Sequence, residues 1–176
     1  MRYLIALPVK KEQADSIIEL RDRFKNLAPR WKITLGPHIT LFRPSEHMLD
    51  KKEAIEIFKK APQTSKFSMQ FGSYEAFLNY SNKVVYLEPA SHAPFKEIKT
   101  LYAPTAAKLL EDSSEIWPYH PHLTLINRLD QSGAEKLLSA LGQMPKPLVI
   151  DFERVCLYKK IGSEPEWVEI ASNQLV

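Results

Sequence analysis

Hydrophobic and polar positions along the chain alternate between two periods, which predicts a protein of mixed strands and helices. Residues 2–7 (RYLIAL) form a short apolar run that is typical of a buried strand. Apolar residues then recur at mostly helical spacing over residues 11–28, which predicts a helix after that strand. A second strand is expected at PHITLF, followed by a helix that has Asp50 as its N-cap and stops at Pro62.

The rest of the chain repeats this alternation of strands and helices. Strands are expected at residues 66–78, 83–89, 120–127, 147–160 and 166–171, with the last two joined around Gly162 as a hairpin. A helix that begins near Ser91 is expected to be interrupted at Pro104, because proline cannot donate a helical hydrogen bond. A further helix is predicted over residues 132–141.

Each half of the pattern places a strand with the letters His-x-Thr after a helix and follows it with another helix and a strand pair. This repetition predicts an internally duplicated, bilobal α+β fold, in which two antiparallel-type sheets face a central cleft and the helices lie outside. The two pseudo-symmetric lobes are expected to form a single domain over residues 1–176, because this length fits one domain and no Gly- or Ser-rich linker separates the halves.

Composition agrees with a folded protein and excludes few function classes. The chain is 44% hydrophobic and 26% charged, near the average for soluble globular proteins. The net charge of +3 permits a polyanionic partner, but Lys and Arg are scattered and form no basic block. The lone Cys156 lies in an apolar run, so we expect a buried thiol and a cytoplasmic setting. Because no apolar stretch reaches ~18 residues, we expect a soluble protein without membrane association. We also expect a monomer.

The sequence Pro-His-aliphatic-Thr-Leu occurs twice, as PHITL around His38 and as PHLTL around His122. Successive side chains of a strand alternate between faces, so His38 shares a face with Thr40, and His122 shares one with Thr124. Packing alone asks only for apolar residues on the inward face and does not explain two copies in equivalent places. The pair therefore predicts a shared active site in the cleft between the lobes.

Two imidazoles and two hydroxyls that face one cleft suit chemistry at a phosphoester. One neutral histidine can accept a proton from an attacking hydroxyl or water, while an imidazolium donates a proton to the leaving oxygen. Both protonation states are accessible near neutral pH, because the ordinary pKa of histidine is ~6.5. Thr40 and Thr124 are candidates to bind the non-bridging phosphate oxygens. This scheme needs no metal and no other cofactor.

A zinc site is the alternative use of the same histidines, because His120 and His122 share a strand face and could bind an ion together with His38. We rank it below acid–base catalysis, since no cysteine pair, HExxH motif or acidic cluster stands nearby. His120 is interpreted as a rim residue just before the strand. His47 and His92 fall in a loop and at a helix start, where solvated side chains are expected.

The paired motifs and the order of strands over nearly the whole chain resemble the 2H phosphoesterase superfamily, and within it the RNA 2′,3′-cyclic phosphodiesterases or 2′-5′ RNA ligase-like proteins. The resemblance implies a bilobal α+β fold, His38 and His122 as the acid–base pair, and Thr40 and Thr124 as phosphate-binding residues. It further implies that His122 activates water and His38 protonates the leaving O3′, to give a 2′-phosphate. The opposite assignment stays open, because the two motifs are nearly symmetric.

The family often has an arginine five positions after the second histidine, but this chain has Asn127 there and Arg128 next to it. Arg128 would lie on the face of His122 if the strand stays regular. Arg43 stands five positions after His38, on the opposite face of a regular strand, unless the strand ends early at Pro44. Both arginines are candidate phosphate or substrate contacts, and a solvated cation at the rim is the alternative for each.

Aromatic residues near the motifs are candidates to stack on a nucleobase, namely Tyr119, Phe42 and Tyr3. Packing in the core or between the lobes is the alternative for each of them. Trp31 and Trp117 precede the two motifs and suggest paired rims of the cleft. The expected substrate is RNA with a 2′,3′-cyclic phosphate or 2′-5′ linkage, or a small nucleotide. The rival functions are another cyclic phosphodiester, reversible RNA ligation, and a non-catalytic RNA-binding module that uses the same cleft.

Overall fold

The fold is described from a computed structural model, which describes residues 2–29, 34–46, 49–110, 118–144, 146–160, 162 and 166–176. The helices are α1 (Lys11–Phe24), the short 3-10 helix η1 (Lys25–Leu27), α2 (Lys51–Lys59), α3 (Ala93–Leu109) and α4 (Gln131–Leu141). The strands are β1 (Arg2–Pro8), β2 (His38–Glu46), β3 (Phe67–Phe77), β4 (Lys83–Pro89), β5 (Leu123–Leu129), β6 (Leu148–Phe152), β7 (Arg154–Lys160) and β8 (Val168–Gln174). The α+β class predicted from the sequence is confirmed.

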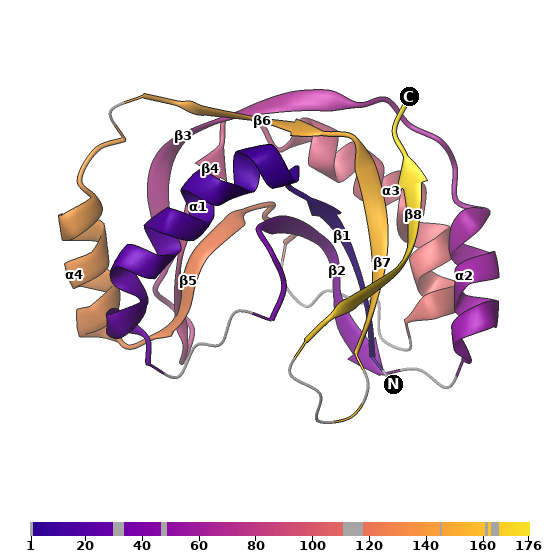
Figure 1. Ribbon diagram of the computed structural model, residues 1–176, viewed down its shortest axis with the longest axis horizontal. Coiled ribbons are helices and arrows are strands. Elements are labelled where there is room, and N and C mark those ends of the chain that lie inside the picture. Colours follow the sequence, from indigo (N-terminus) through magenta and orange to yellow (C-terminus); the bar gives the residue numbers. More distant parts are fainter. Residues whose placement is uncertain are drawn as a thin grey trace.

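The strands form one eight-stranded antiparallel sheet in the order β6-β3-β4-β5-β2-β1-β7-β8, and not the two separate sheets expected from the sequence. Two four-stranded halves meet in the middle, where β2 pairs with β5 through a single pair of residues, Ile39 and Leu123. Figure 1 shows the sheet curving as an arch from β3 to β8. A hydrogen-bonded seam therefore joins the halves at the two motifs.

The halves also exchange strands. β3 follows α2 along the chain, yet it pairs with β4 and β6 in the other half. The stretch 147–160 was predicted as one strand, but it divides at Glu153 into β6, which pairs with β3, and β7, which pairs with β1. The carbonyl of Glu153 accepts a hydrogen bond from the Leu175 amide at 2.7 Å, so this residue leaves both ladders at the crossing point.

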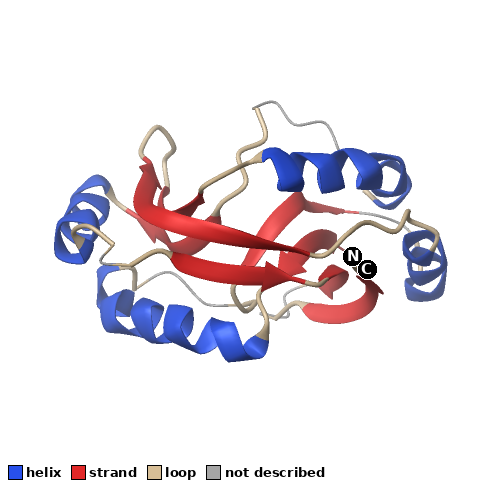
Figure 2. Cartoon of the chain, turned by 90° about the horizontal axis from the view of Figure 1, so that it is seen from above, coloured by secondary structure: helices blue, strands red, loops and turns tan. Residues whose placement is uncertain are grey.

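Helices cover the outer parts of the arch (Figures 1 and 2). α1 and α4 lie against the half that contains β3, β4 and β5, whereas α2 and α3 lie against the half that contains β2 and β8. The expected interruption at Pro104 is wrong, because α3 continues through it to Leu109. Buried residues on both sides of Pro104, including Tyr102 and Ala106, hold the helix on the core and offset the missing hydrogen bond. Asp50 caps α2, as predicted, by accepting the Glu53 amide.

The first strand shows how the sheet divides its two faces. Tyr3, Ile5 and Leu7 are fully buried in the main hydrophobic core under the helices. Leu4 and Ala6 point to the opposite face, where they form a smaller cluster with Cys156 and Tyr158. Burial of Cys156 was predicted, and it raises the pKa of the thiol to about 12. No helix within the described residues is long and apolar enough to cross a bilayer.

Candidate active site

The register at the centre of the sheet brings the two motifs together. Ile39 pairs with Leu123 in antiparallel orientation. In this register His38 comes opposite Thr124, and Thr40 comes opposite His122, with ~4.5–5.5 Å between facing Cβ atoms. The histidine of each motif therefore faces the threonine of the other motif across the seam.

Both imidazoles are held by the same local hydrogen bond. Nδ1 of His38 lies 2.7 Å from the carbonyl oxygen of Gly36, and Nδ1 of His122 lies 2.8 Å from that of His120. A carbonyl only accepts, so each Nδ1 carries the hydrogen and donates it. This tautomer leaves Nε2 of each ring as the atom that gains or loses a proton. The two rings are thus oriented alike, each by a carbonyl two residues earlier in the chain.

Desolvation makes both half-buried imidazoles poor proton acceptors. Desolvation is the main cause that lowers the pKa of His38 to about 4. The hydrogen bond to Gly36 opposes it, and the charges of Arg21 and His122 act in the same direction as desolvation. Desolvation also lowers the pKa of His122 to about 4, with added contributions from His120 and Arg43. Both rings are therefore neutral at pH 7 in the absence of ligand.

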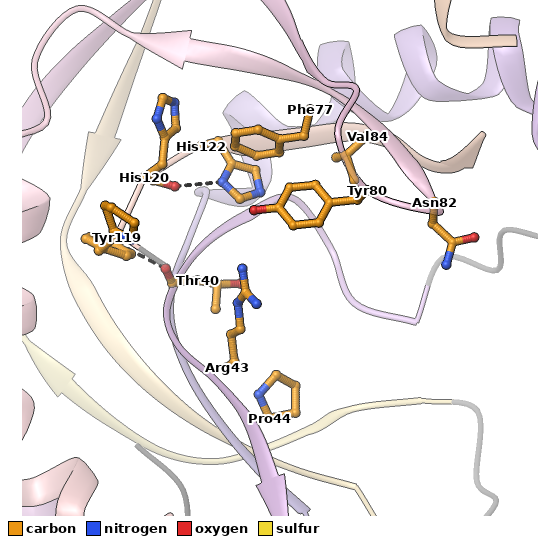
Figure 3. A pocket seen from close by; sticks show the side chains of 11 residues that line it. Thr40, Arg43, Pro44, Phe77, Tyr80, Asn82, Val84, Tyr119, His120 and His122 are labelled. Atoms are coloured by element: carbon orange, nitrogen blue, oxygen red, sulfur yellow. Dashed lines mark hydrogen bonds between the residues drawn. The ribbon is translucent and has the colours of Figure 1, made fainter. Parts of the chain in front are cut away.

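Two adjoining pockets share the walls built by the motifs. Thr40, Arg43 and His122 line one pocket together with Phe77, Tyr80 and other residues. In Figure 3 the Arg43 guanidinium and the Tyr80 hydroxyl are directed toward the space beside the His122 ring. His38 and Thr124 line the second pocket, and Thr40 and Pro44 belong to both. The four motif side chains therefore line two pockets that adjoin at Thr40 and Pro44, and we call these two pockets together the depression.

A bulge in each motif strand decides which later residues reach this depression. In β2, Thr40 pairs with Ala6 and Phe42 pairs with Ile5, so Leu41 is an extra residue. The extra residue reverses the alternation, and Arg43 comes to the same side as His38 and Thr40. β2 continues past Pro44 to Glu46. Arg43 therefore reaches the side of His38 because of the bulge, and not because the strand ends early at Pro44.

β5 has the same bulge at the equivalent residue, Leu125, between the Thr124–Tyr86 and Ile126–Val85 pairs. Asn127 therefore lines the second pocket at the place where the family often has an arginine. Arg128 is the extra residue of a further irregularity, with φ of 61°, and its side chain is exposed. The regular strand that would have aligned Arg128 with His122 is not present.

Sequence reasoning missed Arg21, a buried arginine on the apolar face of α1. Its side chain is only 3% exposed and lines the second pocket with His38, Thr124 and Asn127. Nη2 of Arg21 donates to the carbonyl oxygen of Thr124, next to the bulge. Burial lowers the pKa of the guanidinium to about 10, so it still carries its charge at neutral pH. The helical spacing of Arg21 with Ala14 and Ile17 was the signal that it faces inward.

The predicted aromatic contacts divide between cleft and core. Tyr119 lines the first pocket, and its hydroxyl donates to the Thr40 carbonyl at 3.0 Å. Phe42 is 4% exposed and lies in the main core, with Nζ of Lys99 4.2 Å from its ring centroid. Tyr3 is fully buried in the core and donates to the Leu49 carbonyl. Trp31, Trp117 and His47 lie outside the described residues.

Phe77 and Tyr80, on and after β3, form a wall of the first pocket that sequence reasoning did not identify. The Phe77 ring packs edge-on against His122 at 4.9 Å between centroids, with an interplanar angle of 87°. It packs in the same way against His120 at 5.2 Å. These contacts depend on the pairing of β3 with β4, which brings a distant turn beside the second motif.

His92 and His120 also differ from expectation. His92 is half-buried, and its Nε2 lies 2.7 Å from Oε1 of Glu88, so it is not the solvated residue predicted. Nε2 of His120 lies 2.8 Å from Oε2 of the same carboxylate. His120 does lie at the rim of the pocket, as interpreted from the sequence. Its side chain belongs to a cluster with Glu88 and His92, and not to one with His38 and His122.

The chain resembles known proteins in sequence and in fold. A family model described as the 2′-5′ RNA ligase superfamily matches residues 8–164. The chain belongs to this superfamily. The membership confirms the 2H phosphoesterase resemblance of the paired motifs and supports a phosphodiesterase-type role. No curated protein matches the chain.

Solved structures share the fold at low sequence identity. Escherichia coli LigT complexed with 3′-AMP is 16% identical, with a TM-score of 0.69 and coverage of 99% of this chain and 97% of that chain. TT0787 of Thermus thermophilus is 15% identical, with a TM-score of 0.67 and coverage of 99% and 98%. Usb1 of Kluyveromyces marxianus is 9% identical, with a TM-score of 0.57 and coverage of 96% and 97%. At these identities the likeness establishes the fold.

Proposed function

We propose that the protein is a metal-independent phosphodiesterase that hydrolyses 2′,3′-cyclic phosphates, or 2′-5′ linkages, in RNA ends or small nucleotides. The observation that carries the proposal is the Ile39–Leu123 pair, because its register sets each motif histidine opposite the threonine of the other motif. The matching Nδ1 hydrogen bonds support it, since they leave both Nε2 atoms available for proton transfer.

The proposed reaction uses the two rings in opposite protonation states. Nε2 of neutral His122 accepts a proton from water as the water oxygen forms a bond to phosphorus. The bond between phosphorus and O3′ breaks, and Nε2–H of protonated His38 donates its proton to O3′. The products are a 2′-phosphate and a 3′-hydroxyl, and the two histidines have exchanged protonation states. The pseudo-symmetric site also permits the roles to be reversed.

Binding of the phosphate raises the pKa of an adjacent imidazole and so produces the protonated ring that acts as the acid. Both rings are neutral before substrate binds, because burial lowers the pKa of each to about 4. A negative charge in contact with an imidazole favours its charged form and raises its pKa. Substrate binding is therefore coupled to uptake of a proton by one ring, which prepares the acid only when a phosphate is present.

Hydroxyls and cations around the depression are assigned to the phosphate oxygens. Thr40 and Thr124 donate to the non-bridging oxygens, where negative charge accumulates in the transition state. Arg43 approaches from the first pocket, and Arg21 approaches from the second. We assign to Arg21 the positive charge that Asn127 cannot provide, because both side chains line the same pocket.

The nucleotide class of substrate is supported by the family and by the aromatic wall. Escherichia coli LigT has been solved complexed with 3′-AMP and with ATP. In this chain Phe77, Tyr80 and Tyr119 border the pocket beside His122. Aromatic rings stack on nucleobases without strong sequence preference, at about 1–3 kcal/mol per base in single-strand binders. The first pocket is the proposed position of the base, next to the phosphate site.

The test is turnover of a 2′,3′-cyclic mononucleotide in excess EDTA, with the products separated to distinguish 2′- from 3′-phosphate. We expect 2′-phosphate as the product. His38→Ala and His122→Ala should each lower kcat by ~10²–10⁴-fold, the usual contribution of a positioned acid or base. His92→Ala is the matched control, since it removes a half-buried histidine outside the motifs, and it should keep the rate.

Three results would contradict the proposal. Failure to turn over any cyclic phosphate or 2′-5′-linked dinucleotide would remove the proposed substrates. Loss of turnover in EDTA would remove the metal-independent mechanism. A folded His38→Ala or His122→Ala variant that keeps the full rate would remove the two-imidazole scheme.

A further inference from the structure

A second cluster of ionisable side chains lies at the rim of the cleft, outside the two motifs. We call Glu88, His92 and His120 the rim triad. Glu88 lies near the end of β4, His92 directly precedes α3, and His120 lies before β5. Three segments of the chain therefore deliver one carboxylate and two imidazoles to a single point.

The donor atoms of the rim triad converge closely. Nε2 of His92 lies 2.7 Å from Oε1 of Glu88, and Nε2 of His120 lies 2.8 Å from Oε2. One ligand atom from each residue lies within 4.8 Å of the others. The two imidazole centroids are 4.6 Å apart, with the rings inclined at 70°. All three side chains are part-buried, between 24% and 36% exposed.

We propose that the rim triad binds a divalent transition-metal ion of the zinc type. Two histidine nitrogens and one glutamate oxygen are a ligand set that zinc uses in three-ligand sites, which leave a further position open. Zinc bonds of ~2.0–2.2 Å set neighbouring tetrahedral ligand atoms ~3.3 Å apart. The three ligand atoms already lie within 4.8 Å of one another, and the two Nε2 atoms now contact different oxygens of Glu88 at 2.7 and 2.8 Å, distances that widen when the ion enters between them. On metal binding, each neutral imidazole would carry its one proton on Nδ1 and offer the Nε2 lone pair to the ion, in place of its present hydrogen bond to Glu88.

The surroundings hold the ligands in this orientation. Phe77 packs edge-on against the His120 ring at 5.2 Å, and Tyr86 packs against the same ring at 5.6 Å. Outer contacts that fix a ligating imidazole are a regular feature of metal sites. A clasp that merely ties the β4–α3 turn to the segment before β5 needs one imidazole on the carboxylate, namely His120. His92, four residues after Glu88, directs a second imidazole to the same carboxylate and completes a set of three ligands.

The metal site is separate from the proposed catalytic pair but linked to it. His120 lines the first pocket, and its main-chain carbonyl accepts the hydrogen bond from Nδ1 of His122. The metal would therefore lie at the cleft rim and not between the two catalytic rings. Binding does not depend on the proposed reaction, so it is measured directly and without substrate.

The experiment is isothermal titration of the chelator-treated, full-length protein with zinc chloride. We expect a single zinc ion per chain. Glu88→Gln and His92→Ala should weaken binding by about 100-fold or more, exceeding the usual effect of outer-shell changes. His38→Ala is the matched control and should bind zinc like the unaltered chain. Circular dichroism of each variant verifies the fold, and Glu88→Gln keeps the size of the side chain.

Other outcomes overturn the proposal. Absence of stoichiometric zinc binding shows that the rim triad is a hydrogen-bonded clasp only. Zinc binding that is lost in His38→Ala and kept in His92→Ala places the ion on the catalytic histidines. Binding that survives in both folded rim variants places it elsewhere on the surface.

Discussion

At the scale of single residues, the doubled sequence encodes an orientation as well as a position. Each histidine directs Nδ1 to the carbonyl two residues earlier, on Gly36 or on His120. The intervening residue is proline in both motifs, Pro37 and Pro121, and both are buried. Proline has a fixed φ, so it stiffens this short loop. The ring and its acceptor are therefore set by three consecutive residues.

The low pKa values of the two half-buried imidazoles predict a loss of stability in acid. The unfolded chain protonates its histidines near pH 6.5, whereas His38 and His122 in the folded chain have pKa values of about 4. Between these values the unfolded state binds more protons, so the free energy of unfolding falls as the pH falls from 6.5 to 4. Urea unfolding at pH 7 and pH 5 measures the fall, which should be smaller in the double variant His38→Asn/His122→Asn. Equal falls in both proteins would show that these rings are not the source.

Arg21 gives a second prediction at this scale. Arg21→Met should weaken the binding of inorganic phosphate by ~10–100-fold, because a hydrogen bond to a charged group contributes ~1.5–3 kcal/mol. Arg21→Lys keeps the charge and should recover part of the affinity, which a purely structural role would not explain. The measurement is titration with phosphate, with urea unfolding as the control for stability. Unchanged phosphate affinity in a folded Arg21→Met variant would remove this residue from the site.

At the scale of elements, the strand bulges are the features that assemble the phosphate site. Leu41 and Leu125 are extra residues at equivalent points of β2 and β5. Each irregular strand also has a carbonyl that accepts from a helix cation, since Lys99 of α3 donates to Leu41 and Arg21 of α1 donates to Thr124. The bulges turn the residues five positions after each histidine into the cleft.

The strand irregularities predict different roles for Arg43 and Arg128, although both were candidate phosphate contacts in the sequence. Arg43→Ala should lower kcat/KM on a cyclic phosphate by about 10-fold or more, because it removes a charge-assisted contact to phosphate. Arg128→Ala removes the same charge from the chain, but its residue is exposed beyond the bulge, so kcat/KM should stay within about twofold at moderate salt. Steady-state kinetics of both variants make the comparison. Equal losses would mean that only general surface charge matters.

At the scale of the whole molecule, exchange of strands makes the two halves interdependent. β3 follows α2 along the chain but belongs to the half of the sheet that α2 does not cover. Later in the chain, β7 pairs with β1, the first strand. One hydrophobic cluster includes residues from both halves, such as Phe58 of α2 and Phe152 of β6. We therefore propose that the described chain unfolds as one cooperative unit, in agreement with the single domain expected from the sequence.

This proposal predicts one calorimetric transition. Phe152→Ala should destabilise the protein by ~3–5 kcal/mol and lower the midpoint of that single transition. Phe152 is fully buried against Phe67 and Phe95, with centroids 5.3 and 5.4 Å away. Val149→Ala on the same strand is the control, since Val149 is 53% exposed and its loss should cost less than ~0.5 kcal/mol. Two separated transitions, with only one shifted by Phe152→Ala, would mean that the halves fold independently.

The sequence by itself determined the alternation of strands and helices, the α+β class and the central pair of motifs. These properties depend on local period and on residue types within a few positions, which a single chain displays directly. The N-cap at Asp50 was predictable for the same reason, because it depends on residues within one turn of the helix. The two histidines and two threonines were accessible for the same reason, since PHITL and PHLTL are visible as a repeat.

Only the tertiary structure decided the number of sheets, the partners of β3 and β7, and the remainder of the site. A bulge is a relation between two strands, so the direction of Arg43 and Arg128 is not written in either strand alone. Arg21 and the rim triad come from helices and turns that meet the motifs only after long-range pairing. The period of the sequence determines which face of a regular helix or strand a side chain occupies. Contacts between elements determine where a strand is interrupted by a bulge and which faces of different elements pack together.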